Sequence, residues 1–171
     1  MLEILTGVLQ GLTEFLPISS SGHLVIISSL SSELDLNTND IAFLHIGTLF
    51  SIVFFYRKRI FEIFEDLDTF VFYFKIILAG IIPAVLIGLL TPIQNIIDDS
   101  PNLILITGAS YLIFSLLLIF SGKINNSEAF GIRDITVSQA FVIGIAQSVA
   151  LLPGVSRSGV TLLTAIYLGV K

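Results

Sequence analysis

Long apolar runs alternate with short polar segments along this chain. Two uncharged runs, residues 76–97 and 100–122, are each long enough to cross about 30 Å of hydrocarbon as a helix. A shorter apolar run at residues 41–56 precedes them. Taken with the charges that flank them, these runs predict three membrane-crossing helices at residues 41–56, 70–90 and 103–121.

Two further apolar stretches are interrupted in the middle by proline and glycine. Residues 1–32 break at residues 16–22, and residues 137–170 break at Pro153 and Gly154. Each half is too short to span a bilayer, and proline removes a helical hydrogen bond, so each stretch predicts a re-entrant hairpin of two half-helices. The half-helices are expected to resume at residues 23–30 and 160–170.

The polar segments orient the chain in the membrane. Arg57 to Arg59 and the loop flanked by Lys123 and Arg133 are basic, which places them on the cytoplasmic side. The acidic segments at residues 33–40 and Asp98-Asp99 then lie outside. Residues 60–68 carry apolar side chains at helical spacing with acidic ones between them, which suits either an interfacial helix or a solvated linker.

An internal repeat relates the two broken stretches. A constant offset of 137 residues aligns Gly7, Gln10, Ser19, Ser21 and Gly22 with Gly144, Gln147, Ser156, Ser158 and Gly159. With three crossings between the copies, this predicts an inverted-topology repeat. The first repeat covers residues 1–136, and the second begins at residues 137–171 and is expected to be C-terminally truncated, from a parent of roughly 270 residues.

Composition agrees with a membrane protein. Hydrophobic residues make up 54% of the 171 residues and charged ones only 12%, and the mean hydropathy is +0.98. The expected fold is an all-α polytopic membrane protein with the lipid bilayer as a partner. The net charge of -5 argues against nucleic acid as a partner.

Two ionised side chains stand out within the apolar stretches. Glu14 and Arg157 lie too far from a helix end to reach water easily, and a charge at membrane depth costs several kcal/mol. Both are therefore candidate functional residues. The alternative is a structural ion pair between them.

The second broken stretch has the features of an anion site. Arg157 lies between Ser156 and Ser158, immediately before a half-helix whose free amides and dipole favour negative charge. Thr161 adds another hydroxyl donor. A helix N-cap formed by Ser158 is the simpler interpretation.

The first broken stretch offers ligands for a cation. Gln10 and Glu14 are four residues apart and share a helical face, and Ser19 to Ser21 and His23 follow just beyond. Carboxylate and amide oxygens suit a hard divalent cation, and histidine can transfer protons near neutral pH. A packing or capping role for His23 is the alternative. For His45, on the next apolar segment, we favour helix packing or pore lining.

The segments QGLTEFLPISSSGH (residues 10–23) and PGVSRSGVT (residues 153–161) resemble the signatures of the undecaprenyl-diphosphate phosphatase family of the bacitracin-resistance type. The resemblance implies an integral membrane hydrolase of the bacterial plasma membrane. Such an enzyme removes the terminal phosphate of undecaprenyl diphosphate at the outer face, with a divalent cation (Mg or Ca), and recycles the lipid carrier for peptidoglycan. Gln10 occupies the variable first position of the family's carboxylate motif, so Glu14 is its one certain carboxylate.

The resemblance also implies roles for individual residues. Arg157 would bind the diphosphate in a pocket that Ser19, Ser21, Gly154, Ser156, Ser158 and Thr161 help to form, and Gln10 and Glu14 would hold metal. Ser20 is the favoured nucleophile with His23 as proton shuttle, although attack by a water activated at Glu14 remains open.

Other functions remain open at this point. Inverted repeats and broken helices are also the architecture of transporters, so a polyprenyl-phosphate transporter or flippase is an alternative. An inactive fragment is another. The sequence leaves open whether a second copy of the chain is a partner in a homodimer.

Overall fold

The computed structural model describes residues 2–31, 38–121 and 131–170. No β-strand occurs in these ranges, and nearly all of them are helical, so the all-α prediction is confirmed. Most of the acidic segment 33–40, and Lys123, lie outside the described residues. The helices are α1 (Leu2–Thr13), α2 (Ser20–Leu30), α3 (Thr38–Phe55), α4 (Arg57–Glu65), α5 (Leu67–Leu90), α6 (Ile93–Asp98), α7 (Leu103–Ser121), α8 (Val137–Gln147) and α9 (Arg157–Tyr167), with short 3-10 helices η1 (Ile132–Asp134) and η2 (Ser148–Leu151).

Two helices are long and apolar enough to cross a membrane unaided. These are α5, with 24 residues and a mean hydropathy of 2.4, and α7, with 19 residues and 2.5. A third candidate span is α3 together with α4, which bend by 66° at their junction. Large apolar side chains such as Leu89 and Leu105 are 80% and 72% exposed, as expected where lipid rather than water surrounds a helix. The protein is a multi-pass membrane protein.

Capping residues account for the bounds of α5, which differ from the prediction. The helix begins at Leu67 rather than at residue 70 because the Asp66 carboxylate accepts a hydrogen bond from the Thr69 backbone N–H at 3.0 Å. Hydrogen bonds from the Thr69 hydroxyl and N–H also lower the pKa of Asp66 below its usual value. The helix stops at Leu90 because Pro92 disfavours helical backbone before it, and α6 replaces the predicted acidic loop.

Serine caps set the start of both second half-helices. The Ser19 side chain accepts from the N–H of Gly22 at 3.4 Å, and the Ser156 side chain accepts from the N–H of Gly159 at 3.2 Å. Each helix therefore starts three residues earlier than predicted, α2 at Ser20 and α9 at Arg157. The two caps and the two starts obey the same offset of 137 residues.

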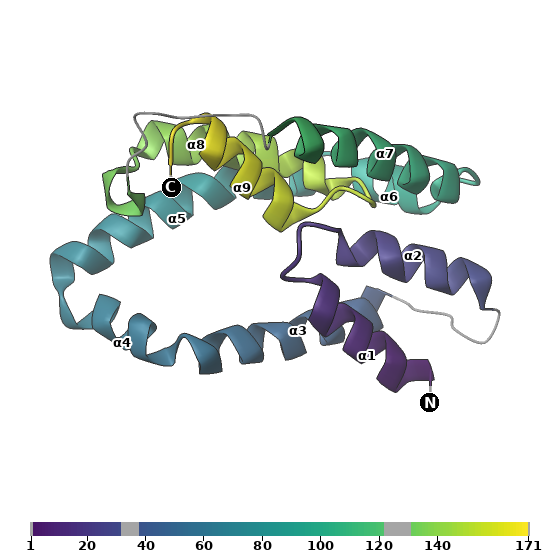
Figure 1. Cartoon of the computed structure of the whole chain (residues 1–171), viewed down its shortest axis with the longest axis horizontal. Helices are drawn as coiled ribbons and strands as arrows, with labels where there is room; N and C mark the ends of the chain where they lie inside the picture. Colours follow the sequence, from purple (N-terminus) through teal and green to yellow (C-terminus); the bar gives the residue numbers. More distant parts are fainter. Residues whose placement is uncertain (1, 32–37, 122–130, 171) are drawn as a thin grey trace.

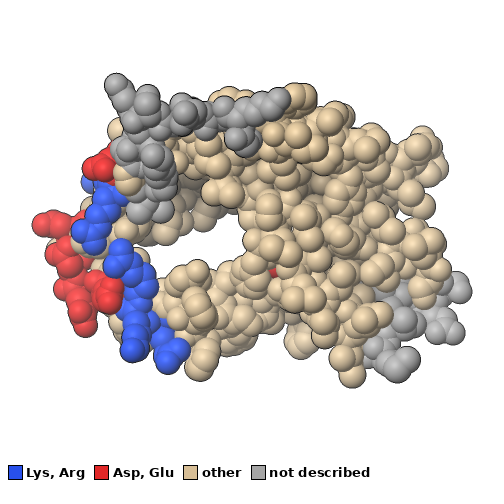
Figure 2. All heavy atoms as spheres, viewed as in Figure 1, with Lys and Arg blue, Asp and Glu red and all other residues tan. Residues whose placement is uncertain are grey.

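The two hairpins point in opposite directions. In Figure 1 the α1–α2 hairpin opens toward the end of the molecule where the N-terminus lies, and the α8–α9 hairpin opens toward the end where α4 and η1 lie. Their turns face each other in the middle. Figure 2 shows that the charged side chains visible on this face gather at the α4 end.

Helix α8 lies against α5 at a contact between small residues. A Cβ atom built on Gly144 would lie 2.5 Å from the Gly80 carbonyl oxygen and 3.0 Å from Cδ of Pro83. The two backbones therefore touch, as is common where membrane helices pack tightly. This contact fixes the first half of the second hairpin to the longest helix.

Replacing Gly144 with alanine should destabilise the protein by about 1–3 kcal/mol, because the new methyl group pushes α8 away from α5. Thermal unfolding in detergent micelles measures the change. Gly108→Ala in α7 is the matched control, since its Cβ would meet nothing within 4 Å. Equal stability of the two variants would show that the close contact is unimportant.

Candidate functional site

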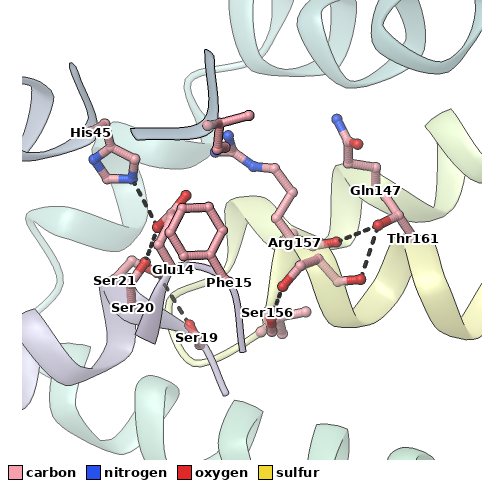
Figure 3. A pocket seen from close by; sticks show the side chains of 14 residues that line it. Glu14, Phe15, Ser19, Ser20, Ser21, His45, Gln147, Ser156, Arg157 and Thr161 are labelled. Carbon is pink, nitrogen blue, oxygen red and sulfur yellow. Dashed lines mark hydrogen bonds and ion pairs between the residues drawn. The ribbon is translucent and has the colours of Figure 1, made fainter. Parts of the chain in front are cut away.

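A cavity of about 350 Å³ lies where the two turns meet (Figure 3). The first turn contributes Glu14 and the start of α2, the second contributes the start of α9, and α3 closes one side. Its lining residues are Glu14, Phe15, Ser19, Ser20, Ser21, His45, Ile52, Gln147, Ala150, Val155, Ser156, Arg157, Ser158 and Thr161. Of the predicted site residues, Gln10, His23 and Gly154 do not line it.

One carboxylate oxygen is the centre of the first half of this site. Oε2 of Glu14 accepts hydrogen bonds from Nε2 of Gln10 at 2.9 Å and from Oγ of Ser20 at 2.5 Å. Nε2 of His45 lies 3.6 Å from the same oxygen. Gln10 is 1% exposed, whereas the Glu14 side chain is 24% exposed and reaches the cavity. A carboxylate that holds a serine hydroxyl in this way can accept its proton.

The serine is presented by an unusual turn. Ser20 is the first residue of α2, and Ser19 before it has φ 61° and ψ 96°, which is uncommon for any residue other than glycine. The Ser19 side chain caps the helix and lies 3.3 Å from the Ser21 hydroxyl. Both residues line the cavity as predicted, and Ser19 belongs to the turn itself.

The structure places His23 behind the turn. Its Nδ1 lies 2.7 Å from the Ser19 carbonyl oxygen and 2.6 Å from the Tyr111 hydroxyl, and its ring meets that of Tyr111 edge to face. Neither His23 nor Tyr111 lines the cavity that Ser20 and Glu14 line. Its predicted role as proton shuttle stays a prediction.

The second half of the site presents Arg157 at the start of α9. Among the described residues its guanidinium makes no hydrogen bond or ion pair, so the alternative of a Glu14–Arg157 ion pair is not what the geometry shows. In Figure 3 the side chain reaches from α9 into the cavity toward the side of Glu14 and His45. An unpaired guanidinium beside the N-terminus of a helix is suited to an anion.

The hydroxyls of the second turn join it to the first. Ser156 and Ser158 lie 3.0 Å apart, and both donate to the Leu16 carbonyl oxygen, at 3.5 and 3.3 Å. Ser156, rather than the expected Ser158, is the N-cap of α9. The Thr161 hydroxyl donates to the carbonyl oxygens of Arg157 and Ser158 within the helix.

Gly154 supports the site from behind. Its φ of 91° suits glycine, and a Cβ there would lie 2.5 Å from the Thr107 carbonyl oxygen of α7. The second turn therefore packs directly against α7 and cannot accept a side chain at this position.

Two polar residues of the cavity were missed as site residues. His45 comes from α3, and only the folded structure brings it to Glu14, so no local pattern could have identified it. Gln147 lines the cavity from the end of α8. The repeat carried a signal for it, because the offset of 137 residues aligns Gln147 with Gln10.

The ligands for a cation are few. The described residues contain no group of three or more His, Cys, Asp or Glu side chains that could hold a metal ion. Glu14 is the one carboxylate among the described residues that line the cavity. Oε1 of Gln10 is buried and accepts no hydrogen bond from the described residues, and such an oxygen can serve as a cation ligand. Gln10 does not line the cavity, so a cation there would have Glu14 as its one carboxylate ligand from the described lining residues and would take its other ligands from water and phosphate.

The fold and site together define a helical membrane protein in which a carboxylate–serine pair and an arginine line one cavity. Comparison with known families then gives its identity. The model of the family "Bacitracin resistance protein BacA" matches residues 3–171, and the chain belongs to this family.

Similar proteins share its whole length. Undecaprenyl-diphosphatase of Christiangramia forsetii is 39% identical over 97% of this chain, and that of Thermosipho africanus is 38% identical over 100%. The protein of the same name from Methanococcus maripaludis strain C5 is 35% identical over 100%. The chain spans 64%, 68% and 69% of these three relatives.

Replacing Arg157 with alanine should weaken the binding of methylenediphosphonate, a diphosphate analogue that is not hydrolysed, by about 10- to 100-fold. The reason is that charge-assisted hydrogen bonds to the guanidinium are lost. Arg157→Lys should recover only part of the affinity, since a single ammonium lacks the planar fork. Isothermal titration calorimetry measures both.

The control for this experiment is Arg59→Ala, which removes an exposed arginine that pairs with Glu62 on α4. It should bind the analogue as the unmodified protein does. Unchanged affinity in Arg157→Ala would exclude Arg157 from the anion site.

Proposed function

We propose that this protein hydrolyses undecaprenyl diphosphate to undecaprenyl phosphate and inorganic phosphate. The observation that carries the proposal is the 2.5 Å hydrogen bond from Ser20 to Glu14 in a cavity that also holds the unpaired Arg157. The relatives' shared name, undecaprenyl-diphosphatase, supports the same reaction. In this role the protein recycles the lipid carrier for peptidoglycan synthesis and gives resistance to bacitracin.

The second turn binds the diphosphate in this proposal. The Arg157 guanidinium offers paired N–H donors to phosphate oxygens, and the first N–H groups of α9 add the positive end of the helix dipole. The Ser158 hydroxyl, which now donates to Leu16, lies beside Arg157 and can turn toward an anion. These groups would stabilise the negative charge of the diphosphate near the Glu14 carboxylate.

The first turn performs the chemistry. Oγ of Ser20 attacks the terminal phosphorus while its proton passes to Oε2 of Glu14, and the bond from that phosphorus to the bridging oxygen breaks. The electron pair leaves with undecaprenyl phosphate. Water then attacks the phosphorus of the phosphoserine and the bond from phosphorus to Oγ breaks. Glu14 returns its proton to Oγ, and both protons of the water leave on inorganic phosphate.

His45 assists Glu14 in this scheme. Its Nδ1 contacts the Ile41 carbonyl oxygen at 2.8 Å and so carries a proton, which leaves Nε2 facing the carboxylate at 3.6 Å. From this position the imidazole would help to hold the carboxylate in place beside Ser20.

Glu14 is the residue that would hold a divalent cation, Mg or Ca, and Gln10 would orient its carboxylate through the hydrogen bond from Nε2. When bound, the cation would neutralise charge on the phosphate oxygens. Magnesium commonly binds proteins through one or two carboxylates and completes its shell with water and substrate phosphates, which matches this sparse set.

The two hairpins form a re-entrant pair in an inverted repeat, with residues 1–136 in the first copy and residues 137–171 in the second. The matched serine caps of α2 and α9, and the opposite directions of the hairpins in Figure 1, support this arrangement. With the basic cluster at Arg57–Arg59 on the cytoplasmic side of the bacterial plasma membrane, the first hairpin opens to the outer face. The substrate then enters from that side.

The transporter alternative is not favoured. A transporter needs no hydroxyl held by a carboxylate, whereas the Ser20–Glu14 pair is what a phosphate transfer requires. The relatives' names also describe a diphosphatase.

The function is tested by phosphate release from undecaprenyl diphosphate in detergent micelles, measured with and without a chelator. The protein should release one phosphate per lipid, and Glu14→Gln should lower kcat by about 10²- to 10⁴-fold, because the amide cannot accept the Ser20 proton. Glu62→Gln on α4 is the matched control and should keep full activity.

The assay with chelator tests the need for a metal ion separately from the reaction itself. Activity that falls at least about tenfold with chelator and returns with Mg²⁺ or Ca²⁺ supports the cation site. Full activity in chelator rejects the cation and leaves the reaction standing. Counterflow of labelled lipid without any phosphate release would favour transport instead.

Replacing Ser20 with alanine distinguishes the two nucleophiles. If Ser20 attacks the phosphorus, Ser20→Ala should lose activity by about 10³-fold or more, and quenching the unmodified protein with substrate should trap a phosphate on Ser20, detected by mass spectrometry. Ser29→Ala, an exposed serine further along α2, serves as the control. Retained activity without a trapped phosphate would show that water attacks directly.

A further inference from the structure

We infer that Tyr111 on α7 is a positioning residue for the proposed reaction, because its hydroxyl holds the turn that presents Ser20. This inference rests on the proposed function of the Ser20–Glu14 pair. Tyr111 does not line the cavity. It acts through the backbone of Ser19.

The Ser19 carbonyl oxygen is the atom through which the turn is held. It accepts a hydrogen bond from the Tyr111 hydroxyl at 2.9 Å and lies 2.7 Å from Nδ1 of His23. The Tyr111 hydroxyl is also 2.6 Å from that Nδ1. A carbonyl oxygen cannot face a bare nitrogen lone pair, so Nδ1 carries the proton and the carbonyl accepts from both side chains.

The turn needs such support because its backbone is strained. Ser19 has a backbone φ of 61°, a value that residues other than glycine rarely adopt. Such a conformation persists only where neighbouring contacts enforce it. The bond from Tyr111 joins residues 92 positions apart in the sequence. It ties the strained residue to a long membrane-spanning helix.

The ring of Tyr111 also fits the start of α2 closely. A Cβ atom on Gly22 would lie 2.7 Å from the ring, so the ring touches the helix backbone at that point. One turn earlier on α7, the Thr107 carbonyl oxygen would lie 2.5 Å from a Cβ atom on Gly154 of the second turn. One face of α7 therefore supports both turns of the site.

The position of the nucleophile follows from this contact. Ser20 is the next residue after Ser19, so any rotation of the Ser19 backbone moves Oγ of Ser20 away from Oε2 of Glu14, now 2.5 Å distant. Displacements of about 1 Å at a reacting group can lower a rate by about 10²-fold. The binding groups on α9 do not depend on this bond.

The test is Tyr111→Phe in the intact protein, which removes the hydroxyl and keeps the ring. With undecaprenyl diphosphate as substrate, kcat should fall about 10- to 100-fold while KM stays within about twofold. Tyr167→Phe removes the same group from an exposed tyrosine on α9 and should change neither constant. An unchanged kcat, or a raised KM with unchanged kcat, would overturn the inference.

A second comparison separates positioning from general stability. Glycine adopts positive φ without steric cost. In a Ser19→Gly background, the decrease in kcat caused by Tyr111→Phe should therefore be smaller by at least about threefold. The same loss in both backgrounds would contradict the role assigned to the hydroxyl. Failure of both the single and the double variant to fold, judged by thermal unfolding, would also overturn it, since Tyr111 would then be structural.

The outcomes distinguish this inference from the proposed function. If the unmodified protein releases no phosphate from undecaprenyl diphosphate, the proposed function fails. If the unmodified protein releases phosphate and Tyr111→Phe has the same kcat, only the role of Tyr111 fails.

Discussion

Backbone polar groups at membrane depth must find partners within the protein, and this constraint shapes the whole site. Two helices break inside the apolar part of the chain, and each break leaves N–H and C=O groups without helical partners. The structure supplies the partners from serine side chains, Ser19 and Ser156, and from hydroxyls that reach across, such as that of Tyr111. Of these groups, the serine side chains that cap the two turns also line the cavity.

The two turns share a local structure but carry different chemistry. Each has a capping serine, a second serine two residues later and a glycine after that, and the residue that opens the helix differs. The first helix opens with Ser20, which is hydrogen-bonded to Glu14, and the second opens with Arg157, whose guanidinium has no partner among the described residues. The same local structure thus brings a serine hydroxyl to the cavity from one turn and a guanidinium from the other.

The architecture could be predicted from the sequence more accurately than the contacts between helices could. Apolar runs located α7 to the residue, and the proline and glycine at each break located both turns, because membrane helices are governed by local hydropathy. Helix starts were misplaced by three residues where serine caps extend α2 and α9. The juxtaposition of His45 with Glu14, and of Tyr111 with Ser19, could not be predicted, since these pairs meet only through packing between distant helices.

The bonds from Ser156 and Ser158 to Leu16 span 140 and 142 residues of sequence. Contacts so distant along the chain form late, because the intervening helices must be inserted and packed before the ends can meet. The first turn, with Glu14 and Ser20, is therefore made well before the chain that carries Arg157. The cavity is complete only once the second hairpin packs against the first turn, so its formation depends on the fold of almost the whole chain.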